Sequence, residues 1–315
     1  MAVFIQSPGM FTTVQDEGRL GYQQYGVSPS GPMDTLSFHL ANILAGNRRT
    51  EGALEVTFTG PEIRFEEAEI FAICGADMRP MLNGAEIPMY AAVRAERGDV
   101  LKLRSALTGM RAYIAFAGGL DVPLVMGSQS TLPQKGLGGV DGRILRKGDR
   151  IGLKAPRTAL PHFAERKLSA PVYPKDEVCV RAIPGPQDSA FSREELNRFF
   201  WYSAVITNQS DRQGIRLKRE EPLKHLRDGN IISDGIAFGS VQVPTDGQPI
   251  VMMADRQTVG GYTKIATVIS ADLPKLAQAR PGMKVRFVRV GVELAQMLCI
   301  KELEALNQLE ERLVG

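Results

Sequence analysis

Cysteine and histidine are scarce in this chain of 315 residues, and neither residue type is grouped. The cysteines form no C-x-x-C pair, and they are Cys74, Cys179 and Cys299. The histidines lie equally far apart, at His39, His162 and His225. Structural zinc sites and disulfide frameworks need closely spaced or paired ligands. We therefore expect neither a structural zinc nor any other bound metal, and the few cysteines suit a reducing cytoplasm.

An excess of charge of one sign and a long hydrophobic run are also missing. Lys+Arg 38 against Asp+Glu 35 gives a net charge of +3 without a basic block, whereas nucleic-acid binders usually cluster their basic residues. No apolar stretch approaches the roughly 20 residues of a membrane-spanning helix. Residues 1–9 lack the charged start and apolar core of a secretory signal. We expect a cytoplasmic protein that binds neither nucleic acid nor membranes.

Common catalytic motifs are absent as well. No G-x-x-x-x-G-K-[ST] phosphate loop occurs, so the sequence identifies no ATP site. The nearest approach to a G-x-S-x-G nucleophile elbow, Gly127-Ser-Gln-Ser-Thr131, lacks the final glycine. Gly282-Met-Lys284 has the Met-Lys pair of biotin-accepting domains, but it lies in a Pro-Gly turn before a strand. A surface lysine is the better interpretation, and we expect no biotin attachment.

Glycine and proline, by contrast, are abundant, with 32 and 19 residues. They place turn signals roughly every 8–12 residues, a spacing typical of antiparallel sandwiches and barrels. Short β-branched or aromatic runs lie between the turns, at 54–58, 69–74, 100–104, 110–117, 178–183, 250–253, 265–269 and 284–290. The sequence therefore predicts a mainly β protein.

Four segments carry helical periodicity instead. They are residues 33–45, 192–201, 272–279 and 292–313. Ser192 is the expected N-cap of the second segment. The last segment has leucines near helical spacing, and this apolar stripe packs either on the chain's own body or on a second copy of the chain.

The length gives a prior of about two domains. The proline-rich, charged stretch 154–175 is the expected boundary. We expect an N-terminal β domain over 1–165, a C-terminal β domain over 176–291 and a C-terminal helix over 292–315. Similar turn-plus-strand patterns in the two halves are a weak indication of related domains.

Polar residues gather in loops flanked by glycine, which is where a β scaffold usually carries its site. The residues that we single out are Asp16, Asp34, Asp211, Arg212, Gln242, Asp255, Arg256, Gln257, Tyr262 and Lys264. Asp and Arg together hold a planar amide or carboxylate, and a lysine adds a point charge. The alternative is that these residues only close turns and form surface ion pairs. Chemistry alone favours neither interpretation.

An ordered series of motifs resembles the family of 5-oxoprolinase C subunits, which is also called KipA or allophanate hydrolase subunit 2. The series covers residues 3 to 290, and its most specific parts are Val14-Gln-Asp16-x-Gly-Arg-x-Gly-Tyr22, Ser210-Asp-Arg-x-Gly-x-Arg216, Gly239-Ser-Val-Gln-Val-Pro-x-Asp-Gly-Gln-Pro-Ile250 and Ala254-Asp-Arg-Gln-Thr-x-Gly-Gly-Tyr-x-Lys264. The resemblance implies two cyclophilin-like β-barrel domains. It also implies a role in opening 5-oxo-L-proline to L-glutamate with consumption of ATP, together with a KipI-like B subunit and a LamB/YcsF-like A subunit.

On this resemblance we assign roles as a hypothesis. Asp255, Lys264, Tyr262 and Asp211 are the expected catalytic residues. The expected substrate-binding residues are Arg212, Arg256, Gln242, Gln257, Asp16 and Asp34. The substrate is a small polar amide, and we expect the isolated chain to be inactive.

Two other functions remain open. The KipA name implies a regulator that antagonises a kinase inhibitor by binding it, which needs no chemistry. Relatives within urea carboxylase imply a carboxyltransferase, which would depend on a biotinylated partner. Mixing the purified chain with its KipI-like and LamB/YcsF-like partners, ATP and 5-oxoproline separates the enzyme from the regulator: glutamate formation that needs this chain supports the enzyme, and stable binding without turnover supports the regulator.

Overall fold

The computed structural model describes residues 2–314, and the chain divides into two compact units. The first unit contains Met1–Arg19, Ser30–Tyr173 and Glu304–Gly315, and the second contains Leu20–Pro29 and Pro174–Leu303. The short segment 20–29 thus belongs with the second unit although its sequence neighbours belong with the first. The C-terminal helix contributes its last residues to the first unit.

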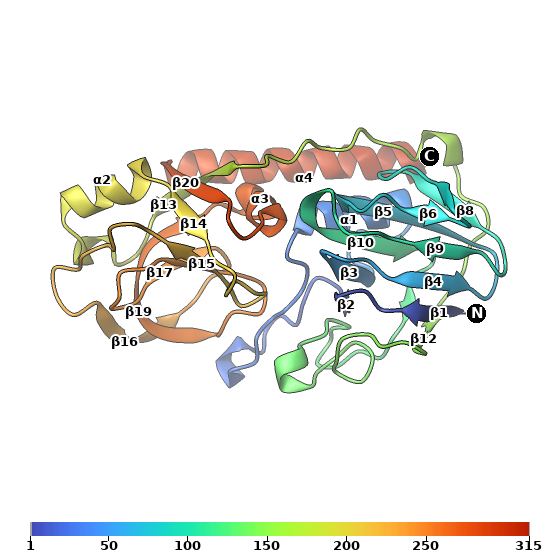
Figure 1. The fold of residues 1–315 in the computed structure, drawn as a ribbon, viewed down its shortest axis with the longest axis horizontal. Helices are drawn as coiled ribbons and strands as arrows, with labels where there is room; N and C mark the ends of the chain where they lie inside the picture. The colour runs from blue at the N-terminus through green and yellow to red at the C-terminus, as the bar shows by residue number, and fades with distance from the viewer. Residues whose placement is uncertain (1, 315) are drawn as a thin grey trace. The chain divides into compact units, whose positions relative to one another are not determined.

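The first unit is built from two sheets (Figure 1). The seven-stranded sheet has the order β11 (Leu120–Asp121), β12 (Arg150–Leu153), β1 (Ala2–Ser7), β4 (Glu62–Phe65), β9 (Val100–Lys102), β6 (Met81–Leu82) and β7 (Ala85–Glu86). The five-stranded sheet has the order β2 (Phe11–Gln15), β3 (Ala53–Thr57), β10 (Thr108–Phe116), β5 (Glu69–Asp77) and β8 (Ala92–Ala95).

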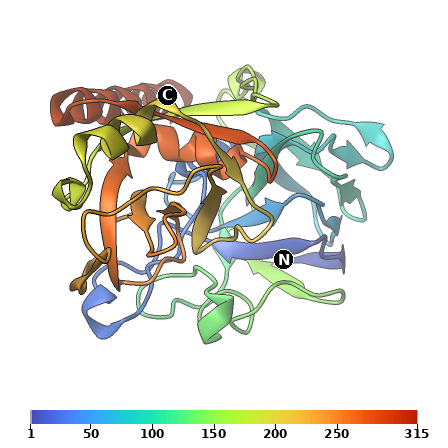
Figure 2. The same cartoon turned by 60° about the vertical axis from the view of Figure 1, so that its left-hand side comes forward.

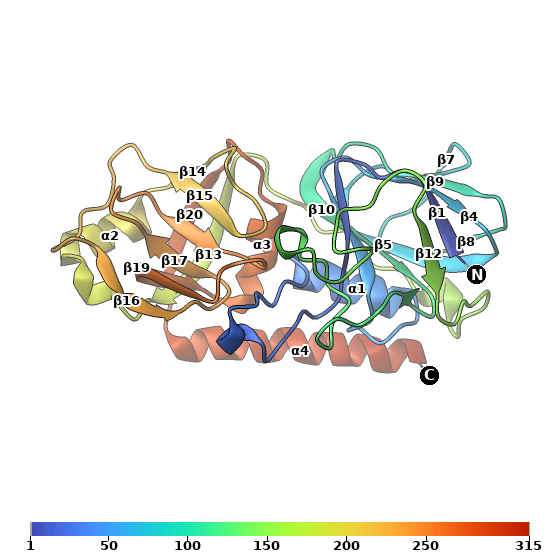
Figure 3. The same ribbon diagram turned by 90° about the horizontal axis from the view of Figure 1, so that it is seen from below.

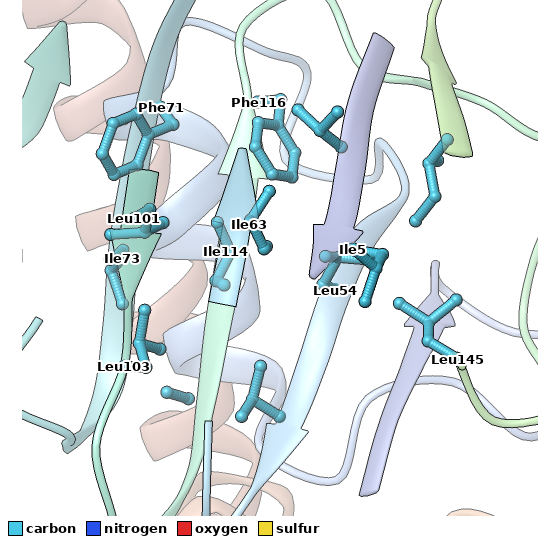
Figure 4. Close-up of a cluster of buried hydrophobic side chains, with 14 of the residues drawn as sticks. Ile5, Leu54, Ile63, Phe71, Ile73, Leu101, Leu103, Ile114, Phe116 and Leu145 are labelled. Carbon is cyan, nitrogen blue, oxygen red and sulfur yellow. The ribbon is translucent and has the colours of Figure 1, made fainter. Parts of the chain in front are cut away.

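The main core of this unit lies between the two sheets (Figure 4). Strand β10 shows how the sequence produces it, because side chains alternate between the faces of a strand. Ile114 and Phe116 enter the core between the sheets, where Phe116 meets Phe65 of the other sheet at a ring-centroid distance of 6.1 Å. Tyr113 and Ala115 point to the opposite face.

Helix α1 (Thr35–Leu44) covers that opposite face. The strands present small residues there, such as Ala72 and Cys74 of β5, so the helix packs closely against the sheet. The C-terminal end of α4 (Val292–Val314) lies beside α1, with Leu306 and Leu313 buried in the same cluster (Figure 3). Of the two alternatives left open for the leucine stripe, the structure shows packing on the chain's own body for this end of the helix.

The second unit contains a closed barrel. Its sheet has the order β13 (Glu177–Pro184), β20 (Lys284–Arg289), β14 (Ala204–Ile206), β15 (Gly214–Lys218), β18 (Ile250–Met252), β17 (Ser240–Val243), β19 (Val259–Val268) and β16 (Asn230–Gly235). An additional antiparallel pairing of β13 with β19 closes seven of these strands into a ring. Strand β16 is left outside the ring and pairs with β19 (Figures 1 and 3).

Two short helices accompany the barrel. Helix α2 (Arg193–Trp201) begins after Ser192, whose side chain accepts a hydrogen bond from Glu195 N as the predicted N-cap. The helix lies on the outside of the barrel (Figure 2), where Phe199 stacks on Phe287 of β20 with ring centroids 4.5 Å apart. Helix α3 (Leu273–Gln278) precedes β20.

The predicted mainly β class, with few short helices and a C-terminal helix, is confirmed. All four predicted helices form within a few residues of their expected bounds, and the predicted strand segments all contain strands. Single 3₁₀ turns occur at Gln23–Tyr25, Pro133–Lys135, Phe163–Glu165, Asp188–Ala190 and Ser270–Asp272.

Candidate functional site

The second unit contains a cavity of about 530 Å³ beside strands β15, β17 and β18. Polar side chains dominate its lining, and five of them are glutamines. The lining residues are Thr207, Gln209, Gln213, Gly214, Arg216, Leu217, Lys218, Gln242, Pro244, Asp246, Gln248, Pro249, Ile250, Met252, Gln257 and Tyr262. Amides offer both donors and acceptors without net charge, so this cavity suits a small polar ligand.

Two of the glutamines converge on one point of the wall. Gln242 lies on β17 and is almost fully buried, yet its Nε2 has no hydrogen-bond partner among the described residues. A Cβ built on Gly260 would lie 2.7 Å from Gln242 Nε2 and 2.9 Å from Gln257 Nε2. Glycine at 260 therefore leaves room for both amide nitrogens. A buried donor without an acceptor is costly, and it is typical of a site that a ligand completes.

Strand β19 brings further polar groups to the same side of the sheet. Gly260, Tyr262 and Lys264 are two residues apart, so they share one face of the strand. Lys264 is the register partner of Gln242 on β17, and Tyr262 lines the cavity. Of the predicted site residues, the structure thus brings Gln242, Gln257, Tyr262 and Lys264 into one neighbourhood.

The ammonium group of Lys264 is held by an ion pair. Its Nζ lies 2.7 Å from Asp234 Oδ2 and donates to Gly235 O at 3.2 Å. The side chain of Lys264 is 3% exposed, whereas that of Asp234 is 55% exposed. The hydrogen bond from Lys264 holds the pKa of Asp234 below its usual range. The sequence did not single out Asp234, because nothing in the primary structure pairs it with Lys264.

Arg212 and Asp255 form a second ion pair, and it is buried on both sides. Arg212 Nε and Nη2 donate to the two carboxylate oxygens of Asp255, each at 2.9 Å. Asp211 is exposed and accepts hydrogen bonds from the backbone N–H groups of Gln213 and Gly214, so it shapes the turn that carries Gln213. These three residues support one wall of the cavity and are not part of its lining.

Arg256 is partly buried and donates hydrogen bonds to the backbone of its own unit. Its Nε donates to Ile236 O at 3.0 Å, and its guanidinium carbon lies 5.4 Å from the centre of the Phe238 ring. Burial lowers the pKa of Arg256. This arrangement braces the segment that follows β16, and the predicted contact of Arg256 with substrate stays a prediction.

Asp16 and Asp34 belong to the first unit and organise its loops. Asp16 accepts hydrogen bonds from Gln129 N and from the hydroxyls of Ser128 and Ser130. Asp34 is the N-cap of α1 and accepts from Ser37 N at 2.9 Å. Their predicted part in substrate binding stays a prediction, because the lining of the cavity comes from the second unit.

The remaining lining residues were not singled out individually from the sequence. Gln209, Gln213 and Gln248 lie inside the polar segments, but no sequence motif distinguishes a glutamine that lines a cavity from a glutamine in an exposed loop.

Within residues 2–314, no group of three or more His, Cys, Asp or Glu side chains is arranged to hold a metal ion. Among the helices that the structure describes, none has the length and apolar character needed to cross a membrane.

Comparison with known proteins places this chain in a family. The family described as carboxyltransferase domain, subdomain A and B, matches residues 25–289. The chain belongs to this family. Its predicted resemblance to the C subunits of 5-oxoprolinase is also confirmed. The chain is 40% identical over 294 residues to the 5-oxoprolinase C subunit of Escherichia coli (strain K12), with 91% of both chains covered.

Two further relatives show the range of the family. The 5-oxoprolinase C subunit of Haemophilus influenzae is 37% identical over 304 residues, with 94% of both chains covered. The crystal structure of Kluyveromyces lactis urea carboxylase superposes with a TM-score of 0.90 at 30% identity. The match covers 98% of this chain and 29% of that larger protein.

Proposed function

We propose that this chain is the C subunit of an ATP-dependent 5-oxoprolinase, which hydrolyses 5-oxo-L-proline to L-glutamate together with a KipI-like B subunit and a LamB/YcsF-like A subunit. The two relatives that are named as 5-oxoprolinase C subunits support the proposal because they match over nearly their whole length. In this proposal the isolated chain is inactive, and ATP is consumed by the assembled complex.

One structural observation supports the proposal most directly: Gln242 Nε2 and Gln257 Nε2 converge beside Gly260. A lactam presents a carbonyl oxygen as its strongest acceptor, and this oxygen gains negative charge when water adds to the ring carbon. N–H donors at that position stabilise this charge. Tyr262 lines the same cavity and adds a hydroxyl group beside the reacting ring.

The charged residues around the cavity fit the rest of this substrate. 5-Oxo-L-proline carries a carboxylate besides its lactam, so it needs a cation as well as amide donors. Arg216 and Lys218 of β15 line the cavity, and Lys264 lies beside Gln242 in the sheet. During hydrolysis the ring C–N bond breaks, and one water molecule supplies the new carboxylate oxygen and a proton to the nitrogen, which leaves as the amino group of glutamate. The complex hydrolyses ATP to ADP and phosphate in the same reaction.

Reconstitution tests the proposal. The purified chain is mixed with its KipI-like and LamB/YcsF-like partners, ATP and 5-oxo-L-proline, and glutamate is measured with each component omitted in turn. We expect glutamate only in the complete mixture. Equal glutamate formation without this chain would overturn the proposal, and stable binding to the KipI-like partner without any turnover would support the regulatory alternative.

The match to urea carboxylase favours one second candidate, a carboxyltransferase that moves a carboxyl group from carboxybiotin to urea. The same donor cavity suits a urea carbonyl. This candidate ranks second because the chain covers less than a third of urea carboxylase, whereas it spans nine tenths of the two 5-oxoprolinase relatives. Carboxylation of urea that requires bicarbonate, ATP and a biotinylated partner would support it.

A further inference from the structure

Lys264 carries a charge that the interior does not tolerate without an anion. Its side chain is 3% exposed, and a buried ammonium group needs a hydrogen-bonded counter-charge. Asp234 supplies that counter-charge at 2.7 Å, although the Asp234 side chain is itself 55% exposed. The buried lysine is thus neutralised by a carboxylate that enters from the solvent side.

The strand that carries Asp234 is suited to move. Strand β16 lies outside the closed ring and pairs with β19. Its register shifts between the pairs Asn230–Tyr262 and Asp234–Gly260, and Ile232 in between is 96% exposed. Edge strands with irregular pairing and little burial open at a low free-energy cost. Moving β16 would therefore remove Asp234 from Lys264 while leaving the ring of strands closed.

A buried donor without an acceptor lies on the strand beside Lys264. Gln242, its register partner, has a buried Nε2 without an acceptor among residues 2–314, and Gln257 Nε2 lies close to the same wall. Within the described part of the chain, the side-chain anion on the Lys264 ammonium is the exposed carboxylate of Asp234. A ligand that brings its own carboxylate would satisfy both the lysine and the unpaired amide donor, which Asp234 alone does not do.

We propose that Asp234 is a stand-in for the carboxylate of the substrate: it holds Lys264 when no ligand is bound and gives way when a carboxylate-bearing amide binds. Asp234 is then a positioning residue that competes with the ligand, and β16 is the element that opens. The identity of the ligand as 5-oxo-L-proline rests on the proposed function, whereas the exchange of one carboxylate for another does not.

The test follows the reactivity of Lys264 in the full chain. Asp234→Asn is compared with the wild type and with Asp228→Asn, a nearby exposed residue whose carboxylate accepts from the backbone N–H of Asn230. Each protein is treated with a small amine-reactive acetate ester, and acetylation of Lys264 is followed by mass spectrometry. We expect Asp234→Asn to react about tenfold faster, because the charged hydrogen bond that occupies the Lys264 amine is removed, and Asp228→Asn to react like the wild type.

Adding carboxylates to the acetylation assay shows whether Asp234 is replaced by a ligand or forms a permanent structural ion pair with Lys264. In Asp234→Asn, 5-oxo-L-proline should restore slow acetylation and bind about tenfold more tightly than to the wild type. Protection by acetate or succinate but not by 5-oxo-L-proline would support the stand-in role and count against the proposed substrate. Lack of protection by all three carboxylates would overturn the stand-in role, whatever the complex does in the glutamate assay.

A measurement on the wild-type chain covers the case in which the variant does not fold. The rate of hydrogen exchange of the peptide that spans Asn230–Gly235 should rise when the chain is saturated with a carboxylate that protects Lys264. The reason is that β16 then loses the ion pair between Asp234 and Lys264. Exchange that stays constant or falls on ligand binding would contradict the opening of β16.

Discussion

Arg212 and Asp255 face each other in a buried pair with two parallel hydrogen bonds, each 2.9 Å long. Backbone hydrogen bonds strengthen the connection, because Asp255 N donates to Arg212 O and Met253 N donates to Gln213 O, both at 2.8 Å. The pair thus joins the turn before β15 to the turn after β18, and both turns border the cavity. Its geometry supports a role in holding the wall in place.

Breaking this pair should destabilise the protein. Asp255→Asn leaves Arg212 buried beside a neutral amide, and we expect the free energy of unfolding in urea to fall by about 3–5 kcal/mol. Asp246→Asn is the control, because Asp246 is exposed and its carboxylate accepts from the backbone N–H of Gln248. Asp246→Asn should change stability by less than about 0.5 kcal/mol. An unchanged unfolding curve for Asp255→Asn, with loss of activity in the complex, would instead favour the catalytic role expected from the sequence.

The C-terminal helix should stabilise the chain through its buried end. Leu306 is 5% exposed in the cluster with α1, whereas Leu303 is 48% exposed. Leu306→Ala should lower the free energy of unfolding by about 2–4 kcal/mol, since it removes buried methyl groups and leaves a cavity. Leu303→Ala should have little effect. Equal effects of the two substitutions would contradict the packing of this helix end on the first unit.

Glu69, at the start of β5, should make stability depend on pH. It is almost fully buried, its Oε1 accepts a hydrogen bond from Ile70 N, and its Oε2 has no partner among the described residues. Burial raises the pKa of Glu69 from 4.5 to about 7. Between pH 4.5 and about pH 7, Glu69 is protonated in the folded chain and ionised in the unfolded chain. Unfolding therefore releases a proton in this range, and the free energy of unfolding decreases as pH rises.

Glu69→Gln removes this dependence. Relative to the wild type, the variant should gain about 2 kcal/mol of stability between pH 5 and pH 8, measured by urea unfolding at several pH values. Glu66→Gln is the matched control. A hydrogen bond from Arg150 lowers the pKa of Glu66, so its effect should stay constant over this range. Parallel pH profiles for Glu69→Gln and the wild type would show that Glu69 is ionised in the folded chain.

Replacing Gln242 should lower activity without lowering stability. Gln242→Leu removes a buried donor that has no partner in the described part of the chain, so stability should stay equal or increase. In the reconstituted complex, kcat/KM for 5-oxo-L-proline should fall about a hundredfold, as for loss of one oxyanion donor. Gln296→Leu on the exposed part of α4 should leave both unchanged. A fall in stability with normal activity would show that Gln242 is only a core residue.

The fold could be predicted from the sequence where the signal is local. Ser192 marks the start of α2, the spacing of Leu36, Leu40 and Leu44 marks α1, and turn residues separate the strands. The closure of the barrel was implied by the family resemblance but not by local patterns, because the pairing of β13 with β19 joins segments about 80 residues apart. Strand pairing over such distances depends on the whole chain and leaves no mark in a short window.

The lining of the cavity could be predicted only in part, for the same reason. Gln242, Gln257 and Tyr262 stand in motifs and line the cavity. Asp234 was not predicted as a site residue, because its contact with Lys264 depends on the pairing of β16 with β19. The periodicity of the sequence does not indicate which strands pair. The sequence points to Arg212 and Asp255 as candidate site residues, which stays a prediction, and it does not show that the two residues bind each other.

The central claim is that the cavity beside β19 is where this chain takes part in opening 5-oxo-L-proline. A pair of adjacent glycines tests it most directly. Alanine at 260 would place a methyl group within 2.9 Å of both converging amide nitrogens, whereas alanine at 261 meets no described atom closer than 3.4 Å. Glutamate formation is measured for complexes that contain Gly260→Ala or Gly261→Ala, after both variants are shown to fold and to bind the KipI-like partner. We expect Gly260→Ala to abolish turnover and Gly261→Ala to retain it; wild-type turnover by the Gly260→Ala complex would contradict the account.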